Sequence, residues 1–102
     1  MANELTYIGA VVLHAIRFGQ RYGFQIMAAT EFPSGTVYPA LRRLEKAGLI
    51  RSQWEKAAVA RAEQRPTRKY YQVTPDGESA LTDAGKRYRF PEIEAVHKET
   101  DR

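Results

Sequence analysis

The chain has 102 residues, of which 43% are hydrophobic, and it carries 16 Lys and Arg against 12 Asp and Glu, a formal net charge of +4. This length and hydrophobic content predict one folded domain with a modest core, and the lack of cysteine excludes disulfides and thiolate metal sites. Because no apolar run approaches ~20 residues and no basic segment precedes an apolar run at the start, we expect no transmembrane helix, no signal peptide and a cytoplasmic location.

The first predicted helix spans residues 4–18 and is apolar on more than one side. Leu5, Ile8, Val12 and Ile16 recur every three or four residues, which is the period of one helix face. Other apolar residues lie on the remaining sides, so this helix is expected to be buried or shared with a partner.

A second helix is predicted over residues 22–32 and is expected to end at Pro33, which cannot continue it. Only a few residues then separate it from a third predicted helix. Two short helices joined by a tight turn are the geometry of a helix-turn-helix.

The third predicted helix lies in the stretch from Ser34 to Ile50. The Ser34 hydroxyl is expected to cap its first turn, and Gly48 stands where a left-handed residue would end it. One face carries an apolar stripe. The opposite face has three cations and no acid, and it comprises Thr36, Pro39, Arg42, Arg43 and Lys46, with Tyr38 and Glu45 on one flank.

Two strands, residues 50–54 and 68–73, are predicted to form a hairpin. The segment between them, residues 56–67, has enough alanine for a helix, but its position between two strands favours a flexible basic loop. Trp54 is expected to pack in the core or in an interface rather than to stack on a ligand. Tyr71 is expected in the core beneath the hairpin.

A last major helix is expected to begin at Thr74, whose hydroxyl can cap it, with Pro75 in the first helical position. Its apolar stripe consists mostly of small residues, which permit another helix to approach closely. Phe90–Pro91 is predicted to interrupt it, and Ile93 and Val96 are placed on a final short helical segment. The small-residue stripe and the strongly apolar first helix together predict a homodimer.

No constellation of catalytic or metal-binding residues is evident in the sequence. His14 and His97 lie in different predicted elements, and a core or surface histidine is the favoured interpretation of each. There is no glycine-rich phosphate loop, nucleophile motif or carboxylate pair. We therefore expect neither an enzyme nor a bound cofactor.

The predicted elements, three helices followed by strand, loop, strand and helix, have the order of a winged helix-turn-helix, an α+β and mostly α fold. Residues 51–73 carry six Lys and Arg against two Asp and Glu, which favours an acidic partner, most commonly nucleic acid. We expect double-stranded DNA, with the third helix in the major groove and the hairpin, or wing, on the backbone or minor groove.

The expected DNA-binding residues follow from side-chain type. Arg42 and Arg43 are assigned to base edges, because a guanidinium group can bind guanine through two hydrogen bonds. Lys46, Thr36 and Tyr38 suit phosphate or positioning contacts. The other expected contacts are Ser34 and Pro39 on the helix and Arg61, Arg65, Arg68 and Lys69 on the wing.

A series of motifs runs through most of the chain in a fixed order. They are Tyr22-Gly23-Phe24-Gln25-Ile26, Ser34-Gly35-Thr36-Val37-Tyr38-Pro39-Ala40-Leu41, Arg43-Leu44-Glu45, Gly48-Leu49-Ile50, Trp54, Arg68-Lys69-Tyr70-Tyr71 and Val73-Thr74-Pro75 with Gly77. Together they resemble the signature of PadR-type transcriptional regulators, over roughly residues 5–85.

The resemblance implies a winged helix-turn-helix DNA-binding domain over residues 1–74 and a C-terminal helical dimerisation segment over residues 75–102, within one compact unit. In that family the C-terminal helix pairs with the first helix of the other subunit, and many members bind small aromatic ligands near the dimer interface and release DNA. The sequence departs from the family pattern in the short connection before Ser34, in the alanine-rich wing tip and at Pro91. The expected dimer contacts are Leu5, Ile8, Val12, Leu81, Ala84, Tyr88, Ile93 and Val96.

The leading hypothesis is a homodimeric, sequence-specific repressor that binds a two-fold symmetric operator and is released by a small aromatic effector. Such a protein would work in the bacterial cytoplasm, in association with the nucleoid. The alternative is a winged-helix module that binds protein instead of DNA, although such modules usually lose the basic outer face that this chain keeps.

Overall fold

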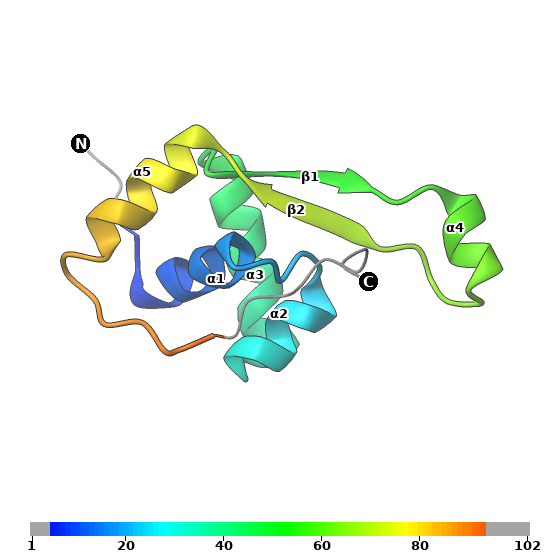
Figure 1. The fold of residues 1–102 in the computed structure, drawn as a ribbon, viewed down its shortest axis with the longest axis horizontal. Helices are drawn as coiled ribbons and strands as arrows, with labels where there is room; N and C mark the ends of the chain where they lie inside the picture. Colours follow the sequence, from blue (N-terminus) through cyan, green and yellow to red (C-terminus); the bar gives the residue numbers. More distant parts are fainter. Residues whose placement is uncertain (1–4, 94–102) are drawn as a thin grey trace, which may run out of the picture.

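The computed structural model describes residues 5–93 and has the element order expected of a winged helix (Figure 1). It is an α+β, mostly helical fold with one two-stranded antiparallel sheet. Three helices, a hairpin and a further helix follow one another as predicted, and one additional helix lies inside the hairpin. The elements are α1 (Tyr7–Arg17), α2 (Gly23–Thr30), α3 (Ser34–Lys46), β1 (Ile50–Trp54), α4 (Ala57–Ala62), β2 (Lys69–Val73) and α5 (Pro75–Ala84).

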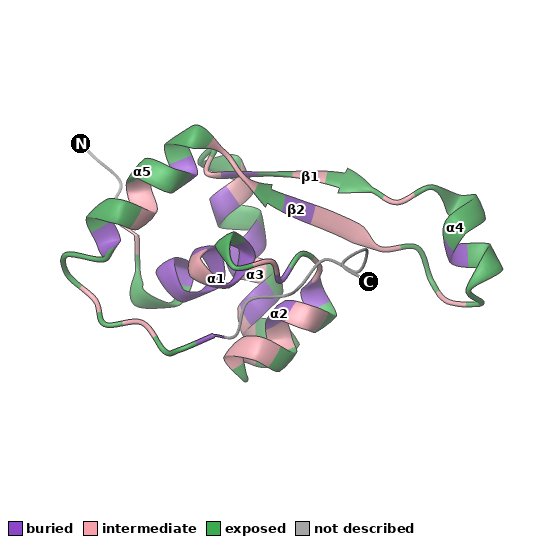
Figure 2. Ribbon diagram, in the orientation of Figure 1, coloured by how far each residue is buried: buried purple, intermediate pink, exposed green. Residues whose placement is uncertain are grey.

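Helix α1 is the centre of the hydrophobic core (Figure 2). It packs against α2, α3, α5 and β2, so apolar residues on several of its sides are buried at once. Leu13, Ile26 and Leu41 are among the largest fully buried side chains. Tyr71 is 6% exposed and joins this core beneath the hairpin, as predicted.

Three expected dimer contacts are instead part of the protomer's own interior. Val12 and Ala84 are both 0% exposed, and Ile93 is 9% exposed and packs in the core cluster. Their assignment to a dimer interface is therefore wrong, because neighbouring elements of the same chain already cover them. Ile8 remains available for a partner, with 37% of its surface exposed.

The helix ends follow local backbone chemistry. The Thr6 hydroxyl accepts a hydrogen bond from the Gly9 N–H at 3.0 Å and caps α1. The prediction that Ser34 caps α3 is wrong, because Pro33 is the N-cap and Ser34 is the first helical residue. Gly48 has a φ of +78° and ends α3 in the left-handed conformation, as predicted.

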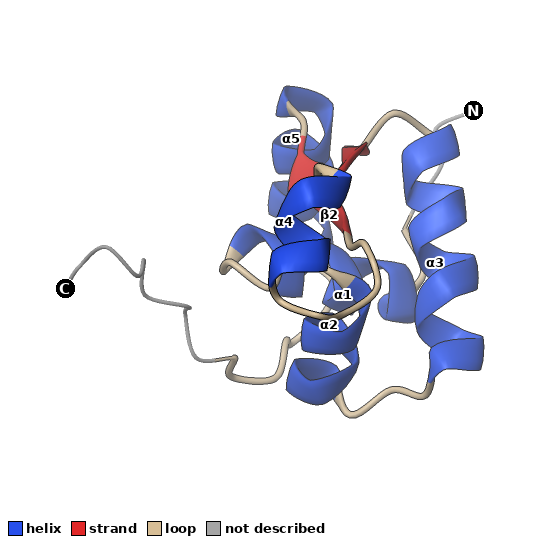
Figure 3. Ribbon diagram, turned by 90° about the vertical axis from the view of Figure 1, so that its right-hand side faces the viewer, coloured by secondary structure: helices blue, strands red, loops and turns tan. Residues whose placement is uncertain are grey.

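The hairpin extends away from the helices, and α4 forms its far end (Figure 1). Ile50 pairs with Val73 at its base and Trp54 with Lys69 at its tip. The prediction of a flexible loop over residues 56–67 is wrong for α4, whose Ala60 is only 3% exposed. Viewed from the tip, α3 stands to one side of the hairpin (Figure 3).

The start of α5 is fixed to the turn between α3 and β1. The Thr74 hydroxyl accepts the Gly77 N–H at 3.0 Å and donates to the Gly48 carbonyl at 2.7 Å, which confirms its predicted capping role. The helix ends at Ala84, before Tyr88, which was expected at the dimer interface. None of the helices within residues 5–93 is long and apolar enough to cross a membrane.

The segment after α5 crosses back over α1. Phe90 stacks on His14, with ring centroids 4.6 Å apart, and partial burial lowers the pKa of His14 despite its hydrogen bond to the backbone of Pro91. The predicted final helical segment is not found at Ile93, which lies in no regular element. Val96, placed on the same predicted segment and expected at the dimer interface, and His97 lie outside the described residues.

Candidate nucleic-acid interface

The outer face of α3 presents cations that are not engaged within the protomer. Arg42, Arg43 and Lys46 are all exposed, and none of them forms an ion pair with another residue in the range 5–93. Ser34 is also exposed, whereas Thr36 and Pro39 are half-buried on the same helix. This face can therefore approach an anionic surface without first breaking an internal salt bridge.

A groove of about 730 Å³ lies between the start of α2, helix α3 and the hairpin. It brings together five of the side chains that the sequence assigned to DNA, from both α3 and the wing. It also contains aromatic residues for which no DNA contact was predicted. The predicted lining residues are Tyr38, Arg42, Arg65, Arg68 and Lys69, and the additional aromatic ones are Tyr22, Phe24, Trp54 and Tyr71.

The remaining predicted contacts lie elsewhere. Arg43 and Lys46 line a second groove, on the flank of α3 that faces the start of α1. Arg61 is on α4, at the far end of the hairpin (Figure 1). The basic surface thus extends from both flanks of α3 to the wing tip.

Trp54 is 61% exposed, so it does not pack in the core, and its packing in an interface, the other predicted environment, stays a prediction. It is the last residue of β1, where the hairpin has passed beyond the helices that cover its base. The Lys69 ammonium group lies 5.6 Å from the centroid of its ring, close enough for a cation–π interaction. The sequence signal that could have indicated this exposure is the position of Trp54 at the distal end of a hairpin strand.

Phe24 is 71% exposed on α2, and Tyr22, just before α2, is covered by the wing. The Arg68 guanidinium lies 4.1 Å from the centroid of the Tyr22 ring, and Tyr22 and Tyr70 meet edge to face at 5.6 Å. These contacts connect the wing to the helix-turn-helix. Arg68 therefore helps to position the wing in addition to its predicted contact with DNA.

Tyr38 passes directly over Gly23, the first residue of α2. A β-carbon at Gly23 would collide with the Tyr38 hydroxyl and would lie 2.7 Å from its Cε1. The absence of a side chain at Gly23 allows this approach. The Tyr38 ring, 41% exposed, is thereby held at the junction of α2, α3 and the groove.

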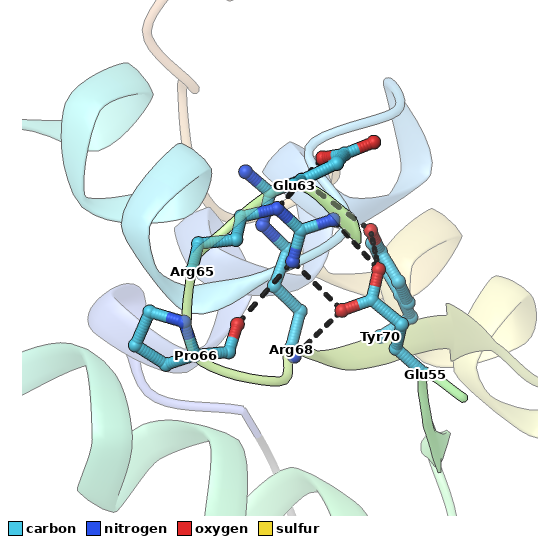
Figure 4. A network of polar contacts seen from close by, with 6 residues as sticks. All are labelled: Glu55, Glu63, Arg65, Pro66, Arg68 and Tyr70. Carbon is cyan, nitrogen blue, oxygen red and sulfur yellow. Dashed lines mark hydrogen bonds and ion pairs between the residues drawn. The ribbon is translucent and has the colours of Figure 1, made fainter. Parts of the chain in front are cut away.

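Glu55 and Arg65 close the base of the wing tip (Figure 4). Both terminal nitrogens of Arg65 donate to the Glu55 carboxylate at 2.7 Å, and the Arg68 backbone N–H donates to the same carboxylate at 3.0 Å. The side chains of Glu55 and Arg65 are only 5% and 18% exposed. This bidentate pair changes the interpretation of Arg65, which holds α4 on the hairpin and is not a free cation for DNA.

The same pair makes the wing tip sensitive to acid. The hydrogen bonds from Arg65 lower the pKa of Glu55 from 4.5 to about 2. Because the folded-state pKa is depressed, the pair contributes its full stabilisation above pH 4.5 and loses it as the pH falls from there through about 2.

Glu55→Gln is expected to destabilise the wing tip at neutral pH, as acid does in the wild type. The side chain of the introduced glutamine is neutral and cannot form the ion pair with Arg65, so the wing tip should open. The Arg68 backbone N–H should then exchange with solvent at least ~10-fold faster than in the wild type. Hydrogen exchange followed by NMR measures this directly. Glu63→Gln is the matched control, since Glu63 also accepts from Arg65 at 2.8 Å but is 59% exposed, and protection of Arg68 should be retained. Equal protection in Glu55→Gln and the wild type would contradict the assigned role of the pair.

The comparisons with known proteins decide the family. The model of the transcriptional regulator PadR-like family matches residues 12–83, which is more than half of the chain. The protein belongs to the PadR-like family. Members of this family are transcriptional regulators and not enzymes, and within residues 5–93 no group of three acidic or histidine side chains could hold a metal ion.

Solved structures share the fold. A PadR family transcription regulator from Clostridium difficile R20291 has a TM-score of 0.70 and 26% identity, covering 82% of this chain and 88% of that one. The protein smu.1704 from Streptococcus mutans UA159 has a TM-score of 0.67 and 27% identity, covering 85% and 82%.

Bacillus subtilis PadR, solved in complex with operator DNA, has a TM-score of 0.68. It is 21% identical over 94% of this chain, which spans 55% of that protein, so this likeness shows the fold alone. Among curated proteins, none matches the sequence significantly.

Proposed function

We propose that this PadR-family protein is a sequence-specific repressor that binds double-stranded DNA as a homodimer. The observation that carries the proposal is the set of exposed cations on α3, Arg42, Arg43 and Lys46, which have no ion-pair partner among residues 5–93. Placing α3 in the major groove would direct Arg42 and Arg43 toward base edges. Membership of a transcriptional regulator family supports DNA as the partner, and one protein that shares the fold, Bacillus subtilis PadR, was solved in complex with operator DNA.

Dimerisation would place two copies of α3 about 34 Å apart, one turn of a two-fold symmetric operator. The N-terminal part of α1 supports a partner contact, since Tyr7 and Ile8 are 43% and 37% exposed. Leu81 and Tyr88, expected at the same interface, are half-buried. The Tyr88 hydroxyl donates to the Leu5 carbonyl at 2.9 Å and joins the segment after α5 to the residues just before α1.

Release by a small aromatic effector is part of the proposal. Bordetella bronchiseptica BpsR shares the fold, with a TM-score of 0.66 and 24% identity over 81% of this chain and 58% of that one. The DNA binding of BpsR is regulated by 6-hydroxynicotinic acid. This protein is expected to respond in the same general way, to its own ligand.

The deciding experiment titrates the protein onto fluorescent DNA from upstream of its own gene and onto a scrambled duplex, at two salt concentrations. Affinity that falls steeply with salt and prefers the native sequence by ~10³-fold or more is the expected result for a specific reader. Equal affinity for both duplexes would contradict sequence specificity. No binding at low salt would remove the repressor function and favour a protein-binding module.

A further inference from the structure

We propose that the groove between α2, α3 and the wing also binds single-stranded nucleic acid, by stacking unpaired bases on its aromatic side chains. This wing groove has a volume of about 730 Å³ and is lined mainly by aromatic and cationic residues. A duplex presents the edges of its bases in its grooves, whereas an unpaired strand also presents their faces. The inference therefore goes beyond operator recognition and does not depend on it.

Three aromatic side chains of the wing groove have exposed surface for a base. Phe24, Trp54 and Tyr38 are 71%, 61% and 41% exposed, although large apolar side chains are normally buried. They come from three elements, α2, β1 and α3, and line the same groove. Stacking on aromatic rings is how proteins hold unpaired bases of any sequence. The wing groove thus has the side chains that an unpaired strand requires.

The fold holds two of these rings in place. Tyr38 passes directly over Gly23, where a β-carbon would collide with it. Trp54 is paired in the sheet with Lys69, whose ammonium group lies 5.6 Å from the centroid of the indole ring. Rings that are already ordered lose little side-chain entropy when a base stacks on them.

The charge of the wing groove suits the phosphates of the same strand. Arg42 and Lys69 line it, and neither forms an ion pair with another residue in the range 5–93. No carboxylate among the described residues lines the groove. A positively charged groove that also carries exposed aromatic rings is the common form of a single-strand site. A strand whose bases stack on the rings can place its phosphates beside Arg42 and Lys69.

The test measures binding of the full chain to a fluorescein-labelled oligothymidylate of about 12 nucleotides, a usual length for a single-strand site. An abasic strand of the same length keeps the phosphates and lacks the bases. Anisotropy at low salt should show saturable binding of the oligothymidylate and at least ~5-fold weaker binding of the abasic strand. Oligouridylate adds the 2′-hydroxyl, so a preference between the two pyrimidine strands would identify RNA or DNA as the natural ligand.

Trp54 is the only tryptophan of the chain, so its fluorescence reports directly on the wing groove. A base stacked on the indole ring is expected to quench this emission when the oligothymidylate binds. The abasic strand should leave the emission unchanged. Saturating oligothymidylate without any change in the emission of Trp54 would overturn the stacking.

Four variants locate the site. Trp54→Ala and Phe24→Ala should each weaken the oligothymidylate at least ~5-fold, the effect of losing one stacked base, and Trp54→Phe should retain most of the affinity because it keeps a ring. Val59→Ala is the matched control, since Val59 is an exposed apolar residue on α4, 43% exposed, that does not line the wing groove. It should leave the affinity unchanged, and an unchanged melting temperature would show that each variant is folded.

The outcomes are distinct. Equal affinity for the oligothymidylate and the abasic strand, or equal affinity of Trp54→Ala, Phe24→Ala and the wild type, would overturn the site. Trp54→Ala should weaken the oligothymidylate more than the operator duplex, and an equal loss for both would mean that the wing groove holds duplex DNA instead. A protein that bound the oligothymidylate but no operator duplex would contradict the proposed repressor function and leave this inference standing.

Discussion

Arg42→Ala is expected to weaken binding to the operator at least ~100-fold. A bidentate arginine–guanine pair contributes roughly 1–3 kcal/mol of discrimination, and a homodimer would lose one from each subunit. Arg42 is exposed and has no ion-pair partner among residues 5–93, so its removal should leave the folded protomer intact. Fluorescence anisotropy with operator and scrambled duplexes would measure the loss, and an unchanged melting temperature would show that the fold is retained.

Two companion variants separate charge from base reading. Arg42→Lys keeps the positive charge but lacks the planar fork, so it should keep most non-specific affinity and lose the preference for the operator. Arg51→Ala removes an exposed cation on β1 that contacts Gln72 at 3.4 Å and does not line the groove beside Arg42. It should change operator affinity only slightly. If Arg42→Ala behaved like Arg51→Ala, α3 would not read DNA through Arg42.

The elements that the sequence predicted well are those specified by local chemistry. Thr74 and Pro75 are residue types favoured as a cap and as a first helical residue, and the structure places them so. Gly48 ends α3 because a left-handed residue is needed after its last turn. The alternation in residues 50–54 and 69–73 was enough to pair the two strands. These features depend on neighbours within a few residues, which periodicity and side-chain type report directly.

The predictions that failed depend on contacts between distant residues. Residues 57–62 had the composition of a helix, but its formation inside the hairpin is supported by the pairing of Glu55 with Arg65 across the wing tip. Nothing in a single sequence indicates that these two charges meet. Val12 looked available to a partner because its helix is apolar on several sides, and only the packing of α2, α3 and α5 around α1 shows that it is covered.

The sequence indicated the exposed charges of α3 but not the aromatic residues that line the groove beside it. The cations of α3 could be placed on the outer face from helical periodicity alone. The exposure of Trp54 and Phe24 could not, since large apolar side chains are normally buried. Their exposure follows from the reach of the hairpin beyond the core and from the position of α2 at the edge of the groove.

Gly77→Ala is expected to lower the free energy of unfolding by about 1–3 kcal/mol, the usual cost of overpacking. In an unconstrained helix the same change would raise the free energy of unfolding by up to ~1 kcal/mol. The packing around Gly77 is therefore expected to reverse the sign of this change. A β-carbon at Gly77 would collide with the Leu49 carbonyl oxygen and would lie 2.8 Å from Val73 Cγ1. A backbone carbonyl cannot rotate away, and the Leu49 carbonyl also accepts the Thr74 N–H at 3.0 Å.

The consequence should extend from α5 to the hairpin. Thr74 joins the start of α5 to the turn that leads into β1, so displacing α5 would disturb the base of the wing. Thermal unfolding should show a melting temperature lower by roughly 4–8 °C for each kcal/mol lost in a domain of this size. Gly35→Ala is the matched control, because nothing lies within 4 Å of a β-carbon at Gly35, and it should leave stability unchanged or raise it. A Gly77→Ala protein as stable as Gly35→Ala would mean that α5 is not held against Leu49 in the folded protein.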